Sequence, residues 1–473
     1  MSVAPLAPGF RNGDVSYWYR VSGRPEPGPP LPGPASADVC VVGAGYTGLW
    51  TAYYLKKARP GLRVTVLERE FAGYGASGRN GGWLLGEVAG SVERYAARHG
   101  RPAAIALQHA MWDAVDEVLR AAAQEGVAAD VVKGGVLTVA RNAAQRERLE
   151  GLVAQSRAWG WGEDDLMLLP DAARDDRLRV AGATAAAWSP HCARVQPAAL
   201  VQGLAGAVRR LGVEIHERTP VLRIEPRRGG APARAVTPHG DVTAEYVVRA
   251  TEGFTAGITG HRRDWLPMNS SMIVTTPLPD AVWREIGWDG RELLGDAAHY
   301  YVYAQRTADG RIALGGRGKP YRYGSRIDDG GRTDPATVGA LWSMLTAMFP
   351  AASGERVAHA WSGVLGVPRD WCATVTLDRV TGLGHAGGYT GHGVATANLA
   401  GRTLRDLVLG EDTALTALPW VGHRVRRWEP EPLRWLGVQA MYGLFRAADG
   451  REAASPDAKT SVLARLAGAV SGH

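Results

Sequence analysis

The segment at residues 38–68 constrains the fold of this chain more than any other part of its sequence. It opens with the apolar run VCVV at residues 39–42, which is typical of a parallel strand buried on both faces. Gly43, Gly45 and Gly48 follow at GxGxxG spacing. At this spacing glycines permit a tight turn, the close approach of a pyrophosphate and the close packing of the next helix on the strand. The segment therefore predicts a dinucleotide site.

The residues after this turn complete the pattern. A helix is expected from Tyr46 to about Ala58, and its N-terminal amides attract an anion. Residues 63–67 are expected to form a second strand, and Glu68 follows Gly48 by 20 residues. A carboxylate there can accept hydrogen bonds from a ribose. It favours a free 2′-hydroxyl, so FAD or NAD fits better than NADP.

A second glycine-rich stretch, GYGASGRNGGW at residues 73–83, lies shortly after the acid. It offers a further set of donors to the pyrophosphate, which a nicotinamide dehydrogenase does not need, so it favours FAD over NAD. On this loop the chain resembles the DAO family of FAD-dependent amine and amino-acid oxidases, whose loop is similar to GASGRNGG. Similar patterns recur in the family's order in RVQPAALVQGLAGAVRRLGVEIHERTPVLRI, VVRATEGFT, DGRIALGGR, WSGVLGVPRDW and GGYTGHGVATANLAGRTLRDLVLG.

The resemblance implies an FAD site assembled from distant parts of the sequence. Val221 is implied to contact the adenine, and Ala250 and Thr251 to pass close to the ADP moiety, with Glu252 where the family has asparagine. The turn GYTGHG at residues 388–393 is implied to lie by the flavin ring, where a helix N-terminus stabilises the negative charge of reduced flavin. The cofactor-binding candidates are Gly43, Gly45, Tyr46, Thr47, Gly48, Glu68, Arg69, Gly75, Ala76, Ser77, Arg79, Asn80, Gly81, Gly82, Val221, Ala250, Thr251, Gly391, His392, Gly393 and Val394.

The expected fold is α/β, or α+β overall, with a Rossmann-like FAD-binding domain interleaved with a β-sheet substrate domain. Residues 1–35 are rich in proline and glycine and are expected to form an extended N-terminal arm. The FAD-binding domain is assigned residues 36–95, 185–260 and 356–420, the substrate domain residues 96–184 and 261–355, and a C-terminal helical tail residues 421–473.

The resemblance also implies the reaction. Flavin N5 accepts a hydride from the carbon that bears a neutral amine, the imine hydrolyses in water, and O2 reoxidises the flavin to give H2O2. Such catalysis needs little acid or base apparatus, so pocket-shaping residues are expected. Two alternatives are a dehydrogenase that passes its electrons to another acceptor and an inactive flavin-binding scaffold. The sequence does not identify the amine or amino acid.

Substrate-binding candidates lie on expected strands of the substrate domain. His299, Tyr301, Tyr303 and Gln305 alternate along HYYVYAQ and would share one face of a strand, either toward the substrate or packed across the sheet. Arg317 and Trp361 are further candidates for contacting the substrate, with a purely structural role as the alternative for each.

Three residues are the candidates for a catalytic role. Tyr301 is taken from the strand face, and His392 from the start of the last FAD-domain helix, where hydrogen bonding to backbone is the alternative. Lys319 follows a GG segment similar to one that, in distant relatives, precedes a lysine promoting the reaction of flavin with O2. Some of those relatives also attach flavin to a cysteine, but Cys372 is expected to be a buried thiol and FAD to be bound non-covalently.

Composition is that of a cytoplasmic enzyme with no expected membrane or nucleic-acid partner. No apolar run approaches the roughly 20 residues that span a bilayer, and the N-terminus lacks a secretory signal pattern. The net charge of +7 comes from scattered arginines balanced by 47 acids. The odd number of widely spaced cysteines, Cys40, Cys192 and Cys372, argues against a disulfide framework. No HExxH, GxSxG or paired CxxC pattern indicates a metal site or nucleophilic catalysis.

Overall fold

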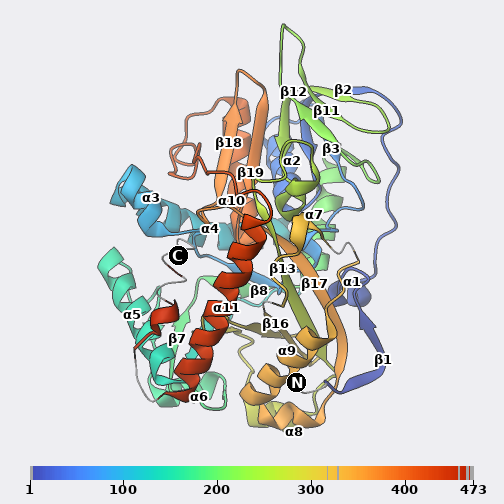
Figure 1. Ribbon diagram of the computed structural model, residues 1–473. Helices are drawn as coiled ribbons and strands as arrows, with labels where there is room; N and C mark the ends of the chain where they lie inside the picture. The colour runs from blue at the N-terminus through green and yellow to red at the C-terminus, as the bar shows by residue number, and fades with distance from the viewer. Residues whose placement is uncertain (1–3, 317, 328–329, 456–458, 465–467, 469–473) are drawn as a thin grey trace.

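The computed structural model describes residues 4–316, 318–327, 330–455, 459–464 and 468. Within them the strands form one sheet of eight strands, one of nine and a short pair. In Figure 1 the eight-stranded sheet occupies the upper half of the molecule and the nine-stranded sheet the lower half. The architecture is the expected mixture of α and β, with both sheets assembled from segments that alternate along the chain.

The eight-stranded sheet combines parallel and antiparallel strand pairs. β2 (Ala35–Val42) lies between β3 (Val64–Leu67) and β12 (Val242–Arg249). β9 (Glu214–His216) pairs with β3, and β19 (Leu383–Gly387) pairs with β12, both in parallel. The sheet is therefore parallel from β9 to β12 and β19, and antiparallel where β10 (Arg223–Glu225), β11 (Ala233–Val236) and β18 (Thr374–Asp378) join it.

One apolar core unites this sheet with its helices, because alternate residues of β2 and β3 pack against apolar helix faces. The helices that contribute are α2 (Tyr46–Ala58), α4 (Arg101–Gln124), α7 (Pro197–Arg210) and α10 (Gly393–Leu409), and α3 (Val92–His99) packs beside α4. On the opposite face Cys40 and Val42 belong to a second core with β11 and β12. The run at residues 39–42 is therefore covered on both faces, as its apolar composition indicates.

The nine-stranded sheet runs in the order β1, β17, β13, β16, β15, β14, β5, β7, β6. Its strands are β1 (Leu6–Asn12), β5 (Val136–Ala140), β6 (Met167–Leu168), β7 (Ala185–Ser189), β13 (Leu266–Thr275), β14 (Leu293–Asp296), β15 (Tyr303–Arg306), β16 (Ile312–Gly316) and β17 (Val357–Val367). The pair β4 (Trp83–Leu85) and β8 (Cys192–Arg194) is antiparallel.

The remaining helices surround the larger sheet. They are α1 (Tyr17–Ser22), α5 (Ala143–Trp159), α6 (Asp171–Arg177), α8 (Asp280–Ile286), α9 (Pro335–Met348) and α11 (Leu433–Ala454), with 3-10 turns η1 (Ala76–Gly78), η2 (Glu252–Gly257), η3 (Tyr323–Ser325) and η4 (Pro350–Gly354). α8 and α9 share an apolar core with the sheet. α11 crosses the front of the lower half in Figure 1 and packs its apolar side on β13 and β17. No helix in the described part of the chain is long and apolar enough to cross a membrane.

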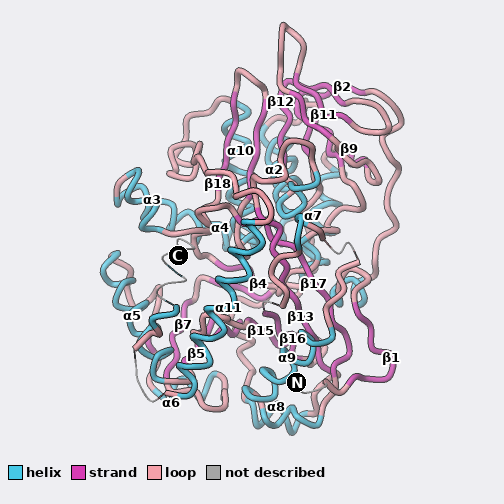
Figure 2. Tube along the Cα trace, viewed as in Figure 1, coloured by secondary structure: helices cyan, strands magenta, loops and turns pink. Residues whose placement is uncertain are grey.

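Several segments differ from the expected division of the chain. β17 and β7 belong to the nine-stranded sheet although their residues were assigned to the FAD-binding domain. The N-terminal arm contains a strand and a helix, since β1 pairs with β17 and α1 follows it. The loop from α1 to β2 then runs along one edge of the molecule toward the smaller sheet, as Figure 2 shows.

The strand expected along HYYVYAQ is shorter than its alternating pattern indicates. β15 begins at Tyr303, so His299 and Tyr301 precede it and the prediction that they share its face is wrong. The physical reason is that carboxylates take the place of a strand partner. Asp449 of α11 accepts the N–H of His299 at 3.0 Å, and Asp296 accepts the N–H of Val302 at 3.0 Å.

Candidate functional site

The turn between β2 and α2 has the geometry for which glycine is needed. Gly43 has φ +106°, and a Cβ on it would lie 2.6 Å from the carbonyl oxygen of Ala250. A Cβ on Gly45 would lie 2.9 Å from Ser77 Oγ, and one on Gly48 would overlap the Gly43 carbonyl oxygen. No side chain can be accommodated on these three glycines, and their bare backbone leaves room for an anionic ligand at the start of α2.

Glu68 lies at the end of β3 next to this turn. Its Oε2 accepts the N–H of Ala44 at 2.8 Å, and its Oε1 accepts the N–H of Glu70 at 3.0 Å. Burial raises the pKa of Glu68, against the effect of these hydrogen bonds. The carboxylate is thus fixed at the place where the sequence pattern predicts a ribose partner.

The loop at residues 73–83 folds back over the start of α2. Ser77 Oγ accepts the N–H of Tyr46 at 2.8 Å. Asn80 braces the loop internally, because its amide donates to the Ser77 carbonyl at 2.9 Å and its Oδ1 accepts the N–H of Gly82 at 2.8 Å. Arg79 is buried and its Nε donates to the Tyr74 carbonyl at 2.8 Å. Arg79 and Asn80 therefore hold the loop in shape.

These elements line one cavity of about 350 Å³. Its wall includes these predicted cofactor residues: Gly43, Gly45, Tyr46, Thr47, Glu68, Arg69, Gly75, Ala76, Ser77, Asn80, Val221, Ala250, Thr251, Gly391, Gly393 and Val394. Gly48, Arg79, Gly81, Gly82 and His392 do not line it. The wall of the cavity contains Glu68 and Val221 and the N-termini of two helices, α2 and α10. Backbone donors at helix N-termini together with a carboxylate for the ribose fit FAD.

The wall also contains residues that are not among the predicted cofactor-binding residues. They are Val42, Leu67, Tyr74, Thr219, Pro220, Leu222, Glu252, Phe254, Gly257, Ile258, Val364, Leu365, Tyr389 and Ala397. Most neighbour a predicted residue in the sequence, so extending each motif by a few residues would have found them. Val364 and Leu365 come from β17, within the family pattern WSGVLGVPRDW, to which no cofactor-binding residue was assigned.

Glu252 is the one carboxylic acid among these additional wall residues. Its Oε1 accepts the N–H of Tyr389 at 2.8 Å and its Oε2 accepts the N–H of Gly366 at 2.6 Å. Burial raises its pKa to about 7, although these backbone N–H groups and Arg249 act in the opposite direction. Glu252 stands where the family has asparagine. Its carboxylate connects η2 to β17 and to the turn before α10.

The last helix of this region reaches the cavity with its N-terminus. Gly391 has φ +122°, and Gly393 and Val394 begin α10. The Tyr389 phenol lies 2.9 Å from Thr47 Oγ1 and so links this turn to α2. The His392 imidazole lies 3.7 Å from Glu87 and does not line the cavity.

Two of the substrate candidates, Tyr303 and Gln305, pack against the end of the glycine-rich loop at residues 81–83. The Tyr303 phenol is 2.8 Å from Ser270 Oγ, and its ring packs edge-on against Trp83 at 6.1 Å. The Gln305 side chain is buried and its amide donates to the Gly81 carbonyl at 2.5 Å. Tyr303 and Gln305 therefore share a face of β15 that covers residues 81–83, and Gln305 is engaged in holding that loop.

The other candidates lie away from the cavity. Trp361 is completely buried, and its indole N–H donates to the Arg79 carbonyl at 2.9 Å. His299 contacts α11, with its Nε2 3.0 Å from Glu452. Tyr301 is partly exposed at 37%. The Lys319 side chain is 70% exposed and lies 3.6 Å from Asp334. Arg317 lies outside the described residues.

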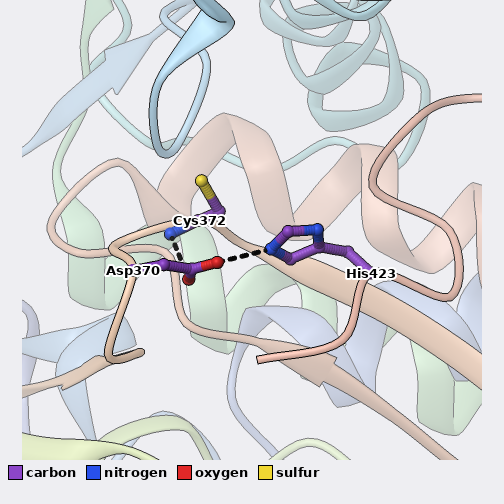
Figure 3. Close-up of side chains that lie close together, drawn as sticks. All are labelled: Asp370, Cys372 and His423. Atoms are coloured by element: carbon purple, nitrogen blue, oxygen red, sulfur yellow. Dashed lines mark hydrogen bonds and ion pairs between the residues drawn. The ribbon is translucent and has the colours of Figure 1, made fainter. Parts of the chain in front are cut away.

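A cluster of Asp370, Cys372 and His423 lies outside the cavity (Figure 3). His423 Nε2 is 2.8 Å from Asp370, and its Nδ1 is 3.1 Å from Arg98. Because a guanidinium only donates, Nδ1 accepts and Nε2 carries the proton that Asp370 accepts. Both ring nitrogens are thereby engaged. The cluster therefore serves to tie the chain before β18 to the segment after α10.

Comparisons with known proteins agree with this geometry. The family model described as FAD dependent oxidoreductase, DAO, matches residues 38–407. Gamma-glutamylputrescine oxidoreductase from Escherichia coli (strain K12) is 29% identical over 419 residues, which cover 86% of this chain and 92% of that protein. Glycine oxidase from Bacillus subtilis (strain 168) is 25% identical over 386 residues, covering 79% and 94% respectively. The crystal structure of glycine oxidase from Geobacillus kaustophilus has a similar fold, with a TM-score of 0.67 and 21% identity, covering 82% of this chain and 99% of that one.

Proposed function

The chain belongs to the DAO family of FAD-dependent oxidoreductases, and we propose that it oxidises a CH–NH bond of a small amine or amino acid and transfers the electrons to O2. When bound, FAD supplies the acceptor for the hydride that leaves the carbon next to the amine nitrogen. The observation that carries the proposal is the cavity, because its wall contains the β2–α2 turn, Glu68 and the N-terminus of α10. Two relatives, a gamma-glutamylputrescine oxidoreductase and a glycine oxidase, support an amine or amino acid as substrate.

Different residues of the cavity wall bind different parts of FAD in this proposal. Glu68 accepts hydrogen bonds from the ribose, and the amides at the start of α2 bind the pyrophosphate. Val221 and Ala250 contact the adenine half. Gly391, Gly393 and Val394 present the positive end of α10 to the place where negative charge develops during reduction.

FAD binds without a covalent bond in this proposal. Cys40, Cys192 and Cys372 are each buried, and none of the three lines the cavity as it is described. Burial raises the pKa of Cys372 to about 11, so its reactive thiolate is scarce near neutral pH. Release of all flavin on acid precipitation is the expected result.

The substrate is proposed to meet the flavin at the face formed by Tyr303 and the loop at residues 81–83. Tyr303 supplies a phenol and Trp83 an indole N–H that is buried without a hydrogen-bond partner among the described residues. A buried donor without a partner is unfavourable unless a ligand satisfies it. These two groups can orient an amine substrate or its carboxylate.

A dehydrogenase is the second candidate, and one observation favours it. Lys319, the residue expected to promote the reaction with O2, is exposed and paired with Asp334 instead of lining the cavity. The residue that the resemblance links to the reaction with O2 is thus absent from the cavity wall as described.

Anaerobic titration of the flavin tests the proposed function. Purified holoprotein is mixed without oxygen with amines and amino acids, including gamma-glutamylputrescine and glycine, and the flavin absorbance is followed. Bleaching by one compound is the expected result. Admission of air should then restore the absorbance and release H2O2. Bleaching that air does not reverse would identify a dehydrogenase, and no bleaching by any amine would contradict the proposal.

A further inference from the structure

Glu252 lines the cavity and combines an unusual backbone conformation with hydrogen bonds to two other segments of the wall. It begins η2, after the two residues that follow β12, and it has φ +42°, in the left-handed region. Asparagine adopts this region more readily than glutamate does, so a glutamate here carries backbone strain. Strain of this kind is kept where the surrounding structure requires the side chain. The hydrogen bonds of Glu252 indicate what that requirement is.

The carboxylate of Glu252 connects two further segments to η2. One oxygen accepts the N–H of Gly366 on β17, and the other accepts the N–H of Tyr389 in the turn before α10. Tyr389 in turn contacts Thr47 on α2 through its phenol. Glu252, Tyr389 and Thr47 all line the cavity. A single carboxylate thus fixes the relative positions of the strand, the flavin-side turn and, through Tyr389, the pyrophosphate-side helix.

The neighbouring chain is adapted to this carboxylate. A Cβ on Gly366 would overlap Glu252 Oε2, so only glycine leaves room for the hydrogen bond. A Cβ on Gly253 would lie 2.7 Å from the side chain of Val364, which keeps η2 close against β17. The arrangement therefore depends on a glutamate and a glycine that are 114 residues apart.

The charge of Glu252 is only partly compensated. The cation that faces it is Arg249, whose guanidinium also lies 3.4 Å from Asp264. Burial lowers the pKa of Arg249 to about 10, so it stays charged at neutral pH. From β17 and from the turn before α10, the groups that face Glu252 are neutral backbone N–H groups. Above its pKa of about 7, Glu252 therefore adds negative charge to the cavity wall.

We propose that Glu252 is a positioning residue for the cofactor, which fixes the turn at residues 388–391 against β17 and whose ionised carboxylate lowers the reduction potential of the bound flavin. Reduction adds negative charge to the flavin, and a carboxylate nearby disfavours that charge. The inference requires FAD binding but no particular substrate. It extends the proposed function by assigning control of the flavin's potential to one residue of this chain.

The decisive variant is Glu252→Gln, because it keeps the size of the side chain and removes its charge. An amide has one acceptor oxygen and directs an NH2 group at the second backbone N–H, so one hydrogen bond is lost. The affinity for FAD, measured by quenching of flavin fluorescence at pH 8.5, is expected to fall about tenfold or more. The midpoint potential, measured by dye-coupled reductive titration of the holoprotein at the same pH, is expected to become more positive.

Two further variants make the test specific. Gly366→Ala crowds the carboxylate without removing its charge, so we expect weaker FAD binding from a protein whose Glu252 is intact. Glu217→Gln is the control, since Glu217 is buried and accepts backbone N–H groups as Glu252 does, from Ala72 at 2.7 Å and from Gly28, but pairs with Arg209 at 3.0 Å and does not line the cavity. It is expected to leave both the affinity and the potential at wild-type values. Far-UV circular dichroism of each apoprotein reports whether the variant folds.

Either of two results would overturn the inference. A Glu252→Gln protein with wild-type FAD affinity would show that the carboxylate does not position the cavity wall, and one with an unchanged midpoint potential would show that its charge does not reach the flavin. If this variant does not fold, Gly366→Ala decides, and wild-type affinity in it overturns the inference. Because no amine is added, the result is independent of whether the protein oxidises any amine.

Discussion

The backbone of Gly48 in α2 lies directly against the carbonyl oxygen of Gly43, so close that a Cβ on Gly48 would overlap that oxygen. The same Cβ would lie 3.1 Å from the side chain of Val41 on β2. The helix therefore rests on the strand at the point where its first amides turn toward the cavity. The distance between α2 and β2 sets where those amides lie.

Gly48→Ala is expected to push α2 away from β2. Overpacking of a buried contact costs about 1–3 kcal/mol, and a backbone contact of this kind belongs at the upper end of that range. We expect a lower melting temperature and weaker FAD binding together, measured by thermal unfolding and flavin fluorescence.

The control for that substitution is Gly443→Ala. Gly443 lies on α11, where a Cβ would meet nothing within 4 Å. Alanine has the higher helix propensity, so the change should stabilise the protein by about 0.5–1 kcal/mol and leave FAD binding as it was. Equal loss of affinity in both variants would mean that the close contact at Gly48 does not matter.

Tyr303→Phe is expected to separate substrate binding from cofactor binding. The phenol of Tyr303 lies 2.8 Å from Ser270 Oγ and outside the cavity wall. If the phenol orients the substrate, its loss should lower kcat/KM about tenfold, the effect of one hydrogen bond, and leave the FAD affinity unchanged. Ser270→Ala keeps the phenol and removes its partner, so its kcat/KM should stay closer to that of the wild type. A Tyr303→Phe enzyme with wild-type kcat/KM would exclude the phenol from the substrate site.

The part of the site that could be predicted from the sequence is the part encoded locally. Gly43, Gly45, Gly48 and Glu68 belong to one strand, helix and strand unit, whose geometry depends on residues close together in the chain. The spacing alone therefore indicates which residue meets the pyrophosphate and which meets the ribose. The predicted α/β architecture follows for the same reason, because this unit requires a parallel sheet covered by helices.

The remaining parts depend on contacts between distant segments. The partners of Glu252 are Gly366 and Tyr389, more than 100 residues away in the chain, and no local pattern connects them. The alternation along HYYVYAQ predicted a strand that is cut short, because Asp449 of α11 binds the backbone that a neighbouring strand would have paired. Trp361 was an apparent pocket residue, yet it lies among Tyr17, Trp18 and His359 as part of a core. In each case a tertiary contact overrides the local pattern.

Lys319→Met is expected to leave flavin reoxidation unchanged. The Lys319 ammonium is exposed and pairs with Asp334 at 3.6 Å, and a surface pair of this kind contributes about 0–1 kcal/mol to stability. Stopped-flow mixing of the reduced holoprotein with O2 should give a rate within about twofold of the wild type. A rate reduced tenfold or more would show that the lysine reaches the flavin in the loaded enzyme.

His359 should make the stability of the protein fall in mild acid. The imidazole is buried, and its Nε2 donates to the Gly13 carbonyl at 2.9 Å between the rings of Tyr17 and Trp361. Burial lowers its pKa from 6.5 to about 4. The unfolded chain therefore binds a proton more readily than the folded protein does. The stabilising effect of the neutral imidazole is complete above pH 6.5 and is lost as the pH falls from 6.5 to about 4, by up to about 3 kcal/mol.

His359→Gln isolates this effect because glutamine does not titrate and can still donate to the Gly13 carbonyl. Asp296, whose pKa burial raises to about 6, titrates in the same range but is present in both proteins, so it cancels in their difference. We expect the wild type to be more stable than the variant at pH 7 and to lose that advantage progressively toward pH 4.5, as measured by urea unfolding across the range. A difference that stays constant with pH would mean that His359 has the same pKa in the folded and the unfolded protein, and would contradict the prediction.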